Sequence, residues 1–273
     1  MRGIIWLVLV AACGNDREHA LPGDATDADA ALDAPLAIDS TLALCNRPGL
    51  LFCADFETLA LGPATSTAWT TEAAAGALTI DAAHARGQRA LKVATMGNGR
   101  GRLRVAGLSP AGNSLYGTMH AWVTTFPTAP DYAHFTMVEL AGSGNTTLLR
   151  PVGGQYAPGT PADSFWGVGS DGGPTGDWTN WKRTVPADDA RWMCMEFHLD
   201  AATSTIEVWI DGVAKPEMTV SRASHGGTQV DLVFPTIDTA WFGWWLYQLN
   251  PTPATFEVWL DDLALGATRL GCD

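Results

Sequence analysis

A strand is evident at residues 191–199, where two kinds of side chain alternate. The polar or aromatic set is Trp192, Cys194, Glu196 and His198, and the apolar set is Met193, Met195, Phe197 and Leu199. Successive side chains of a strand point to opposite faces of a sheet, so this pattern predicts a strand with one face in a core. Further along, Asp211-Gly212 follows the run 205–210 and predicts a hairpin turn, because both turn positions tolerate positive φ.

Similar short runs rich in Val, Thr, Trp and Phe recur from residue 50 onward, with turn signals between them. We expect strands at residues 90–93, 119–125, 135–140, 192–199, 205–210, 240–246 and 255–263. The chain has few stretches of helical period. The fold class expected from these patterns is all-β, a two-sheet sandwich or jelly roll.

The composition of the 273 residues excludes several classes. Hydrophobic residues make up 47% and charged ones 16%, so disorder of the whole chain is excluded. The net charge of −13 argues against a nucleic-acid binder, which needs a basic surface, and against attraction to anionic lipid. The 29 Gly, 16 Pro and 12 Trp fit a β domain with many turns.

The first residues are typical of an exported lipoprotein. Residues 1–12 combine a short positive start with an apolar run, and residues 10–13 (Val-Ala-Ala-Cys) match a bacterial lipobox in which Cys13 takes the lipid. The apolar run is too short to span a bilayer core of ~30 Å. The alternative is an ordinary cleaved signal followed by a chance cysteine. If Cys13 carries the lipid, we expect an exported protein that is anchored to the bacterial cell envelope, at the outer membrane or the cell surface.

Residues 13–44 predict an extended tether behind that anchor. Residues 14–44 hold seven acidic side chains and one Arg, with repeated Asp-Ala units and no aromatic residue. Such a segment buries too little surface to order itself. The folded domain is therefore expected at residues 45–273.

Four cysteines remain when Cys13 is set aside: Cys45, Cys53, Cys194 and Cys272. An even number in an exported protein predicts two disulfides, and the sequence alone allows three connectivities. A zinc site would need tighter Cys and His spacing.

Several motifs together resemble a known family. They are residues 52–57 (Phe-Cys-Ala-Asp-Phe-Glu), 133–136, 150–155, 192–198, 206–212, 242–244, 259–266 (Trp-Leu-Asp-Asp-Leu-Ala-Leu-Gly) and 269–272 (Arg-Leu-Gly-Cys). The chain from about residue 50 to 273 resembles the concanavalin A-like (laminin G-like) jelly rolls. Among these, it is similar to the fungal cellulose-induced secreted proteins, which are related to glucuronan lyases. The resemblance implies a jelly-roll fold and a polysaccharide partner.

The resemblance also implies a catalytic set near a concave face: His134, Arg150, Gln155 and Tyr247. In a polysaccharide lyase, Arg150 and Gln155 would neutralise and bind the uronate carboxylate. Either His134 or Tyr247 would then remove the C5 proton in a β-elimination, and the other would protonate the leaving oxygen. The chain departs from the family at His120, where an Arg is common, and at Pro151, which follows Arg150 with an extra residue before Gly153.

Tryptophans are candidates for stacking on sugar rings, since an indole face covers the C–H face of a pyranose. Four lie in loop-like or strand-end contexts and are expected at a sugar platform: Trp166, Trp178, Trp181 and Trp244. Four others are expected to face the core or a sheet: Trp122, Trp192, Trp209 and Trp259.

The resemblance implies two further features. Carboxylates at about the places of Glu57 and Asp262 hold calcium in the family, so a structural Ca²⁺ is expected between the first and last strands. The family pairing implies the disulfide Cys194–Cys272, which leaves Cys45–Cys53. The alternative is Cys45–Cys272 with Cys53–Cys194, because the first and last strands should be adjacent.

The function expected from the sequence is an exported lipoprotein whose jelly roll engages polysaccharide, with lyase action on a uronic-acid polymer as a finer expectation. The alternative is a non-catalytic structural or adhesive protein of the cell envelope. A glycosidase is disfavoured, because the sequence contains no Glu-x-Asp-x-x-Glu arrangement and Glu196 has Cys194 and His198, not a carboxylate, at the alternate positions. We expect a monomer that contacts the membrane only through its lipid and binds no nucleic acid.

Overall fold

The computed structural model describes residues 43–159, 163–174, 178–180, 183–222 and 232–272. The chain divides into two compact units, residues 1–37 and 38–273, and everything below concerns the second. The predictions for Cys13 and for most of the tether fall outside the described residues. Within those residues, no helix has the length and apolar character needed to cross a membrane.

The domain is almost entirely β. Two 3₁₀ turns, η1 (Leu44–Asn46) and η2 (Ala111–Asn113), accompany these strands: β1 (Leu50–Ala54), β2 (Gly62–Pro63), β3 (Thr70–Asp81), β4 (Ala90–Ala106), β5 (Ser114–Val123), β6 (His134–Ser143), β7 (Leu148–Ala157), β8 (Asp163–Asp171), β9 (Trp178–Asn180), β10 (Trp192–Asp200), β11 (Thr205–Ile210), β12 (Val213–Ala214), β13 (Thr236–Leu246) and β14 (Thr255–Gly266). Neighbouring strands pair antiparallel in the order β12-β11-β10-β5-β14-β4-β13-β6-β7-β8-β9. Beside this path, β1 pairs with β14, β3 with β4, and β2 with β3.

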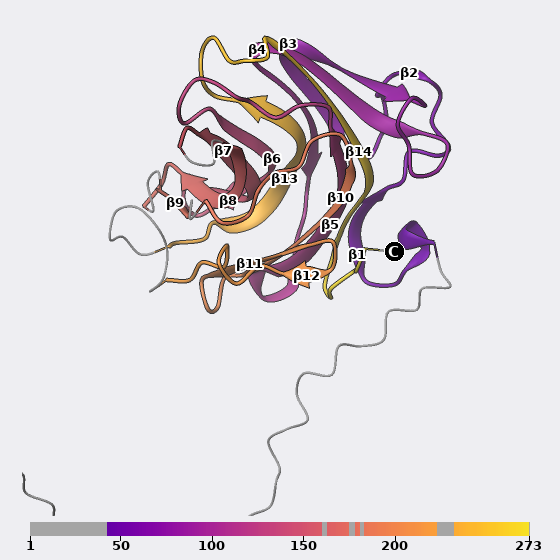
Figure 1. Ribbon diagram of the computed structural model, residues 1–273. Helices are drawn as coiled ribbons and strands as arrows, with labels where there is room; N and C mark the ends of the chain where they lie inside the picture. The colour runs from indigo at the N-terminus through magenta and orange to yellow at the C-terminus, as the bar shows by residue number, and fades with distance from the viewer. Residues whose placement is uncertain (1–42, 160–162, 175–177, 181–182, 223–231, 273) are drawn as a thin grey trace, which may run out of the picture. The chain divides into compact units, whose positions relative to one another are not determined.

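One hydrogen-bonded sheet supplies both layers of the sandwich, because it curls (Figure 1). The long strand β4 pairs with β14 along its first half and with β13 along its second half. Strands β5, β10 and β11 continue one layer, and β6, β7 and β8 continue the other. Strands β10 and β11 contact β7 across the core. The expected all-β jelly-roll sandwich is confirmed.

The alternation at residues 191–199 determines how β10 packs. Its apolar set is fully buried in the core: Met193, Met195, Phe197 and Leu199. Phe197 lies opposite Gly117 of β5, where a Cβ would come within 2.1 Å of the phenyl ring. The expected hairpin also forms, with Asp211 and Gly212 at φ 52° and 76° between β11 and β12.

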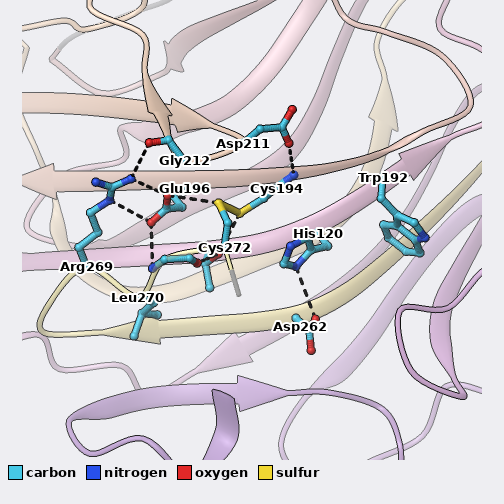
Figure 2. Close-up of a disulfide and its surroundings, with 12 residues drawn as sticks. His120, Trp192, Cys194, Glu196, Asp211, Gly212, Asp262, Arg269, Leu270 and Cys272 are labelled. Carbon is cyan, nitrogen blue, oxygen red and sulfur yellow. Dashed lines mark hydrogen bonds and ion pairs between the residues drawn. A yellow bond between two sulfur atoms is a disulfide. The ribbon is translucent and has the colours of Figure 1, made fainter. Parts of the chain in front are cut away.

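Both disulfides have the pairing that the family resemblance implies, Cys45–Cys53 and Cys194–Cys272. The second ties the end of the chain to β10. Beside it, the buried Glu196 carboxylate accepts two hydrogen bonds from Arg269, at 2.8 and 3.0 Å, and one from the Gly271 amide at 3.0 Å (Figure 2). The chain end is therefore held by a covalent bond and by an ion pair whose carboxylate is buried while the Arg269 side chain is 36% exposed.

Candidate functional site

The side of the β3–β4–β13–β6–β7–β8 region that faces away from the core carries charged and aromatic side chains. We call it the polar face and define it by these residues: Glu72, Arg100, Arg102, Arg104, His134, Thr136, Glu139, Arg150, Gln155, Asp171, Trp241, Trp245 and Tyr247. Strand alternation explains it, because the intervening residues of the same strands fill the core, among them Leu103, Phe135, Leu149, Phe242 and Trp244.

A row of ion pairs crosses this face from β3 to β8. Arg102 donates to Glu72 and to Glu139, at 3.0 Å in each case. Arg150 donates to the other oxygen of Glu139 at 3.4 Å and to Asp171 at 2.9 Å. The side chains of Glu139 and Arg102 are only 3% and 9% exposed, so the middle of the row is shielded from water. Two guanidinium groups thus share three carboxylates.

Aromatic rings pack against these guanidinium groups. Arg102 lies 5.3 Å from the ring centroid of Trp241 and 4.9 Å from that of Trp245. Arg150 lies 4.9 Å from the centroid of the Tyr247 ring, which itself is 4.3 Å from Trp245. All three rings stay partly exposed. The rings of Trp241, Trp245 and Tyr247 therefore form a row, which we call the ladder. Arg102 and Arg150 pack against these rings.

The four residues implied as a catalytic set come together on this face. His134 of β6 lies opposite Gln155 of β7, and the Tyr247 amide donates to the His134 carbonyl at 3.0 Å. The Tyr247 hydroxyl donates to Thr136 at 2.9 Å, and Arg150 covers the Tyr247 ring. The four residues thus come from β6, from β7 and from the residue directly after β13.

The protonation of this set is determined by burial and by neighbouring charges. Burial raises the pKa of Tyr247 to about 12; Arg150 opposes the rise and Glu139 adds to it. Burial alone would lower the pKa of Arg150, but the nearby Tyr247, Glu139 and Asp171 outweigh it and raise that pKa. Tyr247 is consequently a poor base near neutral pH, and Arg150 is a permanent cation.

His134 is held in one tautomer by Gln248. The Gln248 side-chain oxygen accepts a short hydrogen bond from the His134 amide, which fixes the side-chain nitrogen as the group that faces the imidazole. That nitrogen lies 2.9 Å from His134 Nδ1 and can only donate. Nδ1 is therefore the acceptor, and the proton of the neutral ring sits on Nε2.

The expected sugar platform is corrected by the structure. Trp166 and Trp244 are 2% and 0% exposed and pack in the core against Phe126 and Phe135. They are on the core-facing positions of β8 and β13, so they cannot stack on a ligand. Trp181 lies outside the described residues, and the side chain of Trp178 is not described. On the polar face the partly exposed indole rings are Trp241 and Trp245, and their alternation with Tyr247 in residues 241–247 was the available signal.

The predicted calcium ligands are near one another but already have protein partners. Glu57 follows β1 and accepts hydrogen bonds from the amides of Gln88, at 2.9 and 3.0 Å, and Arg89 at 3.4 Å. Asp262 of β14 accepts one from Arg86 Nε at 2.9 Å. A guanidinium therefore takes the place at Asp262 where a cation would bind, and these residues as arranged do not fit Ca²⁺.

Two buried titratable groups adjoin Asp262. His120 Nδ1 lies 3.5 Å from a carboxylate oxygen of Asp262 (Figure 2). Burial, reinforced by the charge of Arg86, lowers the pKa of His120 to about 4. Burial also raises the pKa of Asp261 to about 7. With His120 neutral near pH 7, Arg86 is the cation that balances the carboxylates here.

Chelation is accordingly expected to leave the domain's stability unchanged. Arg86 already supplies a positive charge to Asp262, so removing calcium with EGTA should not shift the melting temperature. Replacing Arg86 with alanine should lower it, and added Ca²⁺ should then restore part of the loss. Differential scanning calorimetry of both proteins in EGTA and in CaCl₂ measures this. A higher melting temperature of the unmodified protein in CaCl₂ would mean that the ion displaces Arg86.

Comparison with known proteins supports the fold. No family model and no curated protein matches the chain. Among solved structures, the cellulose-induced protein Cip1 is similar, with 22% identity over 81% of this chain and 100% of that chain and a TM-score of 0.57. A mutant of alginate lyase Aly36B in complex with alginate tetrasaccharide has 12% identity over 81% of this chain and 98% of its own, with a TM-score of 0.51. The resemblance expected from the sequence motifs is thereby confirmed.

Proposed function

We propose that this domain binds a polysaccharide on its polar face. The observation that carries the proposal is the placement of partly exposed Trp241, Trp245 and Tyr247 beside hydrogen-bonding side chains on one sheet face. Sugars are bound by this combination, because an aromatic ring covers the apolar side of a pyranose while polar groups reach its hydroxyls. The alginate-bound lyase of similar fold supports a glycan as the ligand class.

The test is a binding assay of the full-length protein with a panel of glucuronan, alginate, pectin and cellulose. Replacing Trp245 with alanine removes a ring from the centre of the ladder, and we expect affinity to fall about tenfold, equivalent to ~1.4 kcal/mol. The matched control is Trp209→Ala, which removes a partly exposed tryptophan from β11, away from the polar face. Equal losses in both variants, or no binding to any polymer, would reject the proposal. The second result would favour a structural or adhesive role.

Lyase action on a uronic-acid polymer is the second candidate. The grouping of His134, Arg150, Gln155 and Tyr247 favours it. Three features oppose it: Arg150 is paired with two carboxylates, Tyr247 has a raised pKa, and the Nδ1 atom of His134 is already engaged by the side-chain nitrogen of Gln248. The ultraviolet absorbance of an unsaturated uronate, followed in the same mixtures, would reveal β-elimination. Absorbance that Tyr247→Phe abolishes would establish the enzyme.

We further propose that Cys13 carries a lipid that anchors the domain to the bacterial cell envelope through the acidic tether. The support is the lipobox at residues 10–13 together with the acidic, aromatic-free stretch at residues 14–44. The two disulfides of the folded domain fit an oxidising compartment outside the cytoplasm.

A further inference from the structure

A serine, a histidine and a glutamate form a hydrogen-bonded chain on the outer side of the layer that does not carry the polar face. They come from β5, β10 and β11, which lie side by side (Figure 1). Ser114 Oγ lies 3.1 Å from His198 Nε2, and His198 Nδ1 lies 3.1 Å from Glu207 Oε2. A nucleophile, a base and a carboxylate that orients the base follow one another in this order in enzymes that cleave esters through a serine.

Strand register brings the three side chains together. His198 of β10 pairs with Glu207 of β11 on one side and with Tyr116 of β5 on the other. Ser114 stands two positions before Tyr116 and therefore points to the same side of the sheet. The intervening residues of these strands are buried in the core: Leu115, Phe197, Leu199, Ile206 and Val208.

Glu207 determines the tautomer of His198. An ionised carboxylate only accepts hydrogen bonds, so His198 Nδ1 carries the proton and donates to Glu207. In the neutral ring, Nε2 then has a free lone pair, and the Ser114 hydroxyl is the donor in the 3.1 Å contact with it. The proton of Ser114 is thus already directed at the atom that would remove it.

The imidazole of the base is held in one orientation. The Tyr116 ring stacks on the His198 ring, with the two centroids 4.0 Å apart and the planes 3° from parallel. The side chain of His198 is 15% exposed and that of Glu207 is 43% exposed. Ser114 is half-buried. The chain of three groups is therefore partly ordered by packing and partly open to solvent.

The serine is also held by its local backbone. Ser114 begins β5 directly after the turn η2, in which Gly112 and Asn113 have φ values of 64° and 57°. The Asn113 side chain fixes this turn to the segment before β13. Its Nδ2 donates to the Pro235 carbonyl and its Oδ1 accepts from the Ile237 amide, both at 2.8 Å. Such support from neighbouring hydrogen bonds is what keeps a nucleophile in place.

We infer that Ser114 is the nucleophile of a second site, which hydrolyses carboxylic esters, with His198 as its general base and Glu207 as the positioning residue. Ser114 Oγ forms a bond to the acyl carbon while its proton passes to His198 Nε2. The ester C–O bond then breaks, and the leaving alkoxide takes that proton and departs as the alcohol. Water attacks the acyl-serine with the same base, which releases the carboxylic acid and restores Ser114. One ester and one water thus give one alcohol and one acid, independently of glycan binding on the polar face.

A fluorophosphonate probe tests the nucleophile directly in the full-length protein, because an activated serine hydroxyl expels its fluoride and becomes phosphonylated. We expect peptide mass spectrometry to find the phosphonyl group on Ser114, and labelling to slow about hundredfold in His198→Gln. The matched control is His84→Gln. His84 is also half-buried and stacks on a ring of β5, with its centroid 4.4 Å from that of Trp122. No label on Ser114 of the unmodified protein, or equal labelling rates in the two variants, would overturn the inference.

Steady-state hydrolysis of p-nitrophenyl acetate measures turnover. We expect Ser114→Ala, which removes one hydroxyl from a half-buried position, to keep its melting temperature and to fall to the rate of the ester in buffer. Glu207→Gln should lower kcat and leave KM unchanged, because an amide oxygen holds the Nδ1 proton less strongly than a carboxylate does. Equal rates in the unmodified protein and in Ser114→Ala would mean that the three groups only stabilise the sheet, and the inference would be wrong.

Discussion

Replacing both Cys194 and Cys272 with alanine is expected to lower the free energy of unfolding by about 4.5 kcal/mol. The disulfide joins residues separated by 78 positions, so it removes a large loop from the unfolded ensemble. It also fixes the chain end beside β10, where Glu196 is buried and depends on Arg269 and Gly271. Urea unfolding followed by tryptophan fluorescence gives the free energy directly.

The other disulfide provides the comparison. Cys45 and Cys53 are separated by only 8 positions, and the same loop-entropy relation gives about 2.5 kcal/mol for their replacement by alanine. The order of the two losses is the decisive result. If the Cys194 and Cys272 pair costs no more than the short-loop pair, the Glu196–Arg269 ion pair holds the chain end without the covalent bond.

The strands were predictable from the sequence where only one face of a strand is apolar. β10 shows why: its apolar set of four alternates with Cys194, Glu196 and His198, so the period alone identifies the buried side. The hairpin at Asp211-Gly212 was predictable for a local reason, since its turn needs positive φ at two successive residues. The disulfide pairing was not derivable from spacing and came from the family resemblance.

The wrong half of the sugar platform has a physical cause. Along β13, both faces carry large aromatic residues, with Phe242 and Trp244 on one side and Trp241 and Trp245 on the other. Alternation separates the two sets but does not say which faces the core, because hydrophobicity is similar in both. Which set faces the core is seen only in the folded structure, where Trp241, Trp245 and Tyr247 are partly exposed and Phe242 and Trp244 are buried.

The ion-pair row was missed for a different reason. Its members come from strands far apart in the chain, with Glu139 lying 37 positions from Arg102 and Glu72 lying 30 positions before it. The alternation Arg100, Arg102 and Arg104 along β4 was visible and does indicate one charged face. Which carboxylates would neutralise it depends on the order β3-β4-β13-β6-β7-β8, which no single segment encodes.

Replacing Arg102 with methionine should lower the free energy of unfolding by about 3 kcal/mol or more. The side chain of Arg102 is 9% exposed and donates to Glu139, which is 3% exposed. Methionine keeps the apolar contact with Trp241 and Trp245 but leaves Glu139 with Arg150 as its remaining charged partner. The loss is costly because Glu139 Oε1 then loses its donor Arg102 at a site shielded from water. Thermal and urea unfolding measure the loss.

Arg104→Met is the control for that loss. Arg104 lies two positions along the same strand and faces the same side, but its side chain is 39% exposed and its distance to Glu72 is 3.9 Å. An exposed pair of this kind contributes at most ~1 kcal/mol. Similar losses in the two variants would contradict a special role for the buried row.

A double replacement tests whether the row acts as a unit. Arg102→Met combined with Glu139→Gln removes both the guanidinium of Arg102 and the charge of the Glu139 carboxylate. The double variant should therefore be more stable than Arg102→Met alone. In Glu139→Gln alone, Arg150 keeps Asp171 but loses its second carboxylate, and its guanidinium becomes available to an anion. Glu139→Gln alone should therefore strengthen the binding of uronate hexasaccharides. We expect this because the ion pairs of the row keep the Arg150 guanidinium from a ligand. If uronate affinity does not rise in Glu139→Gln, Arg150 is excluded from ligands by its position rather than by its ion pairs.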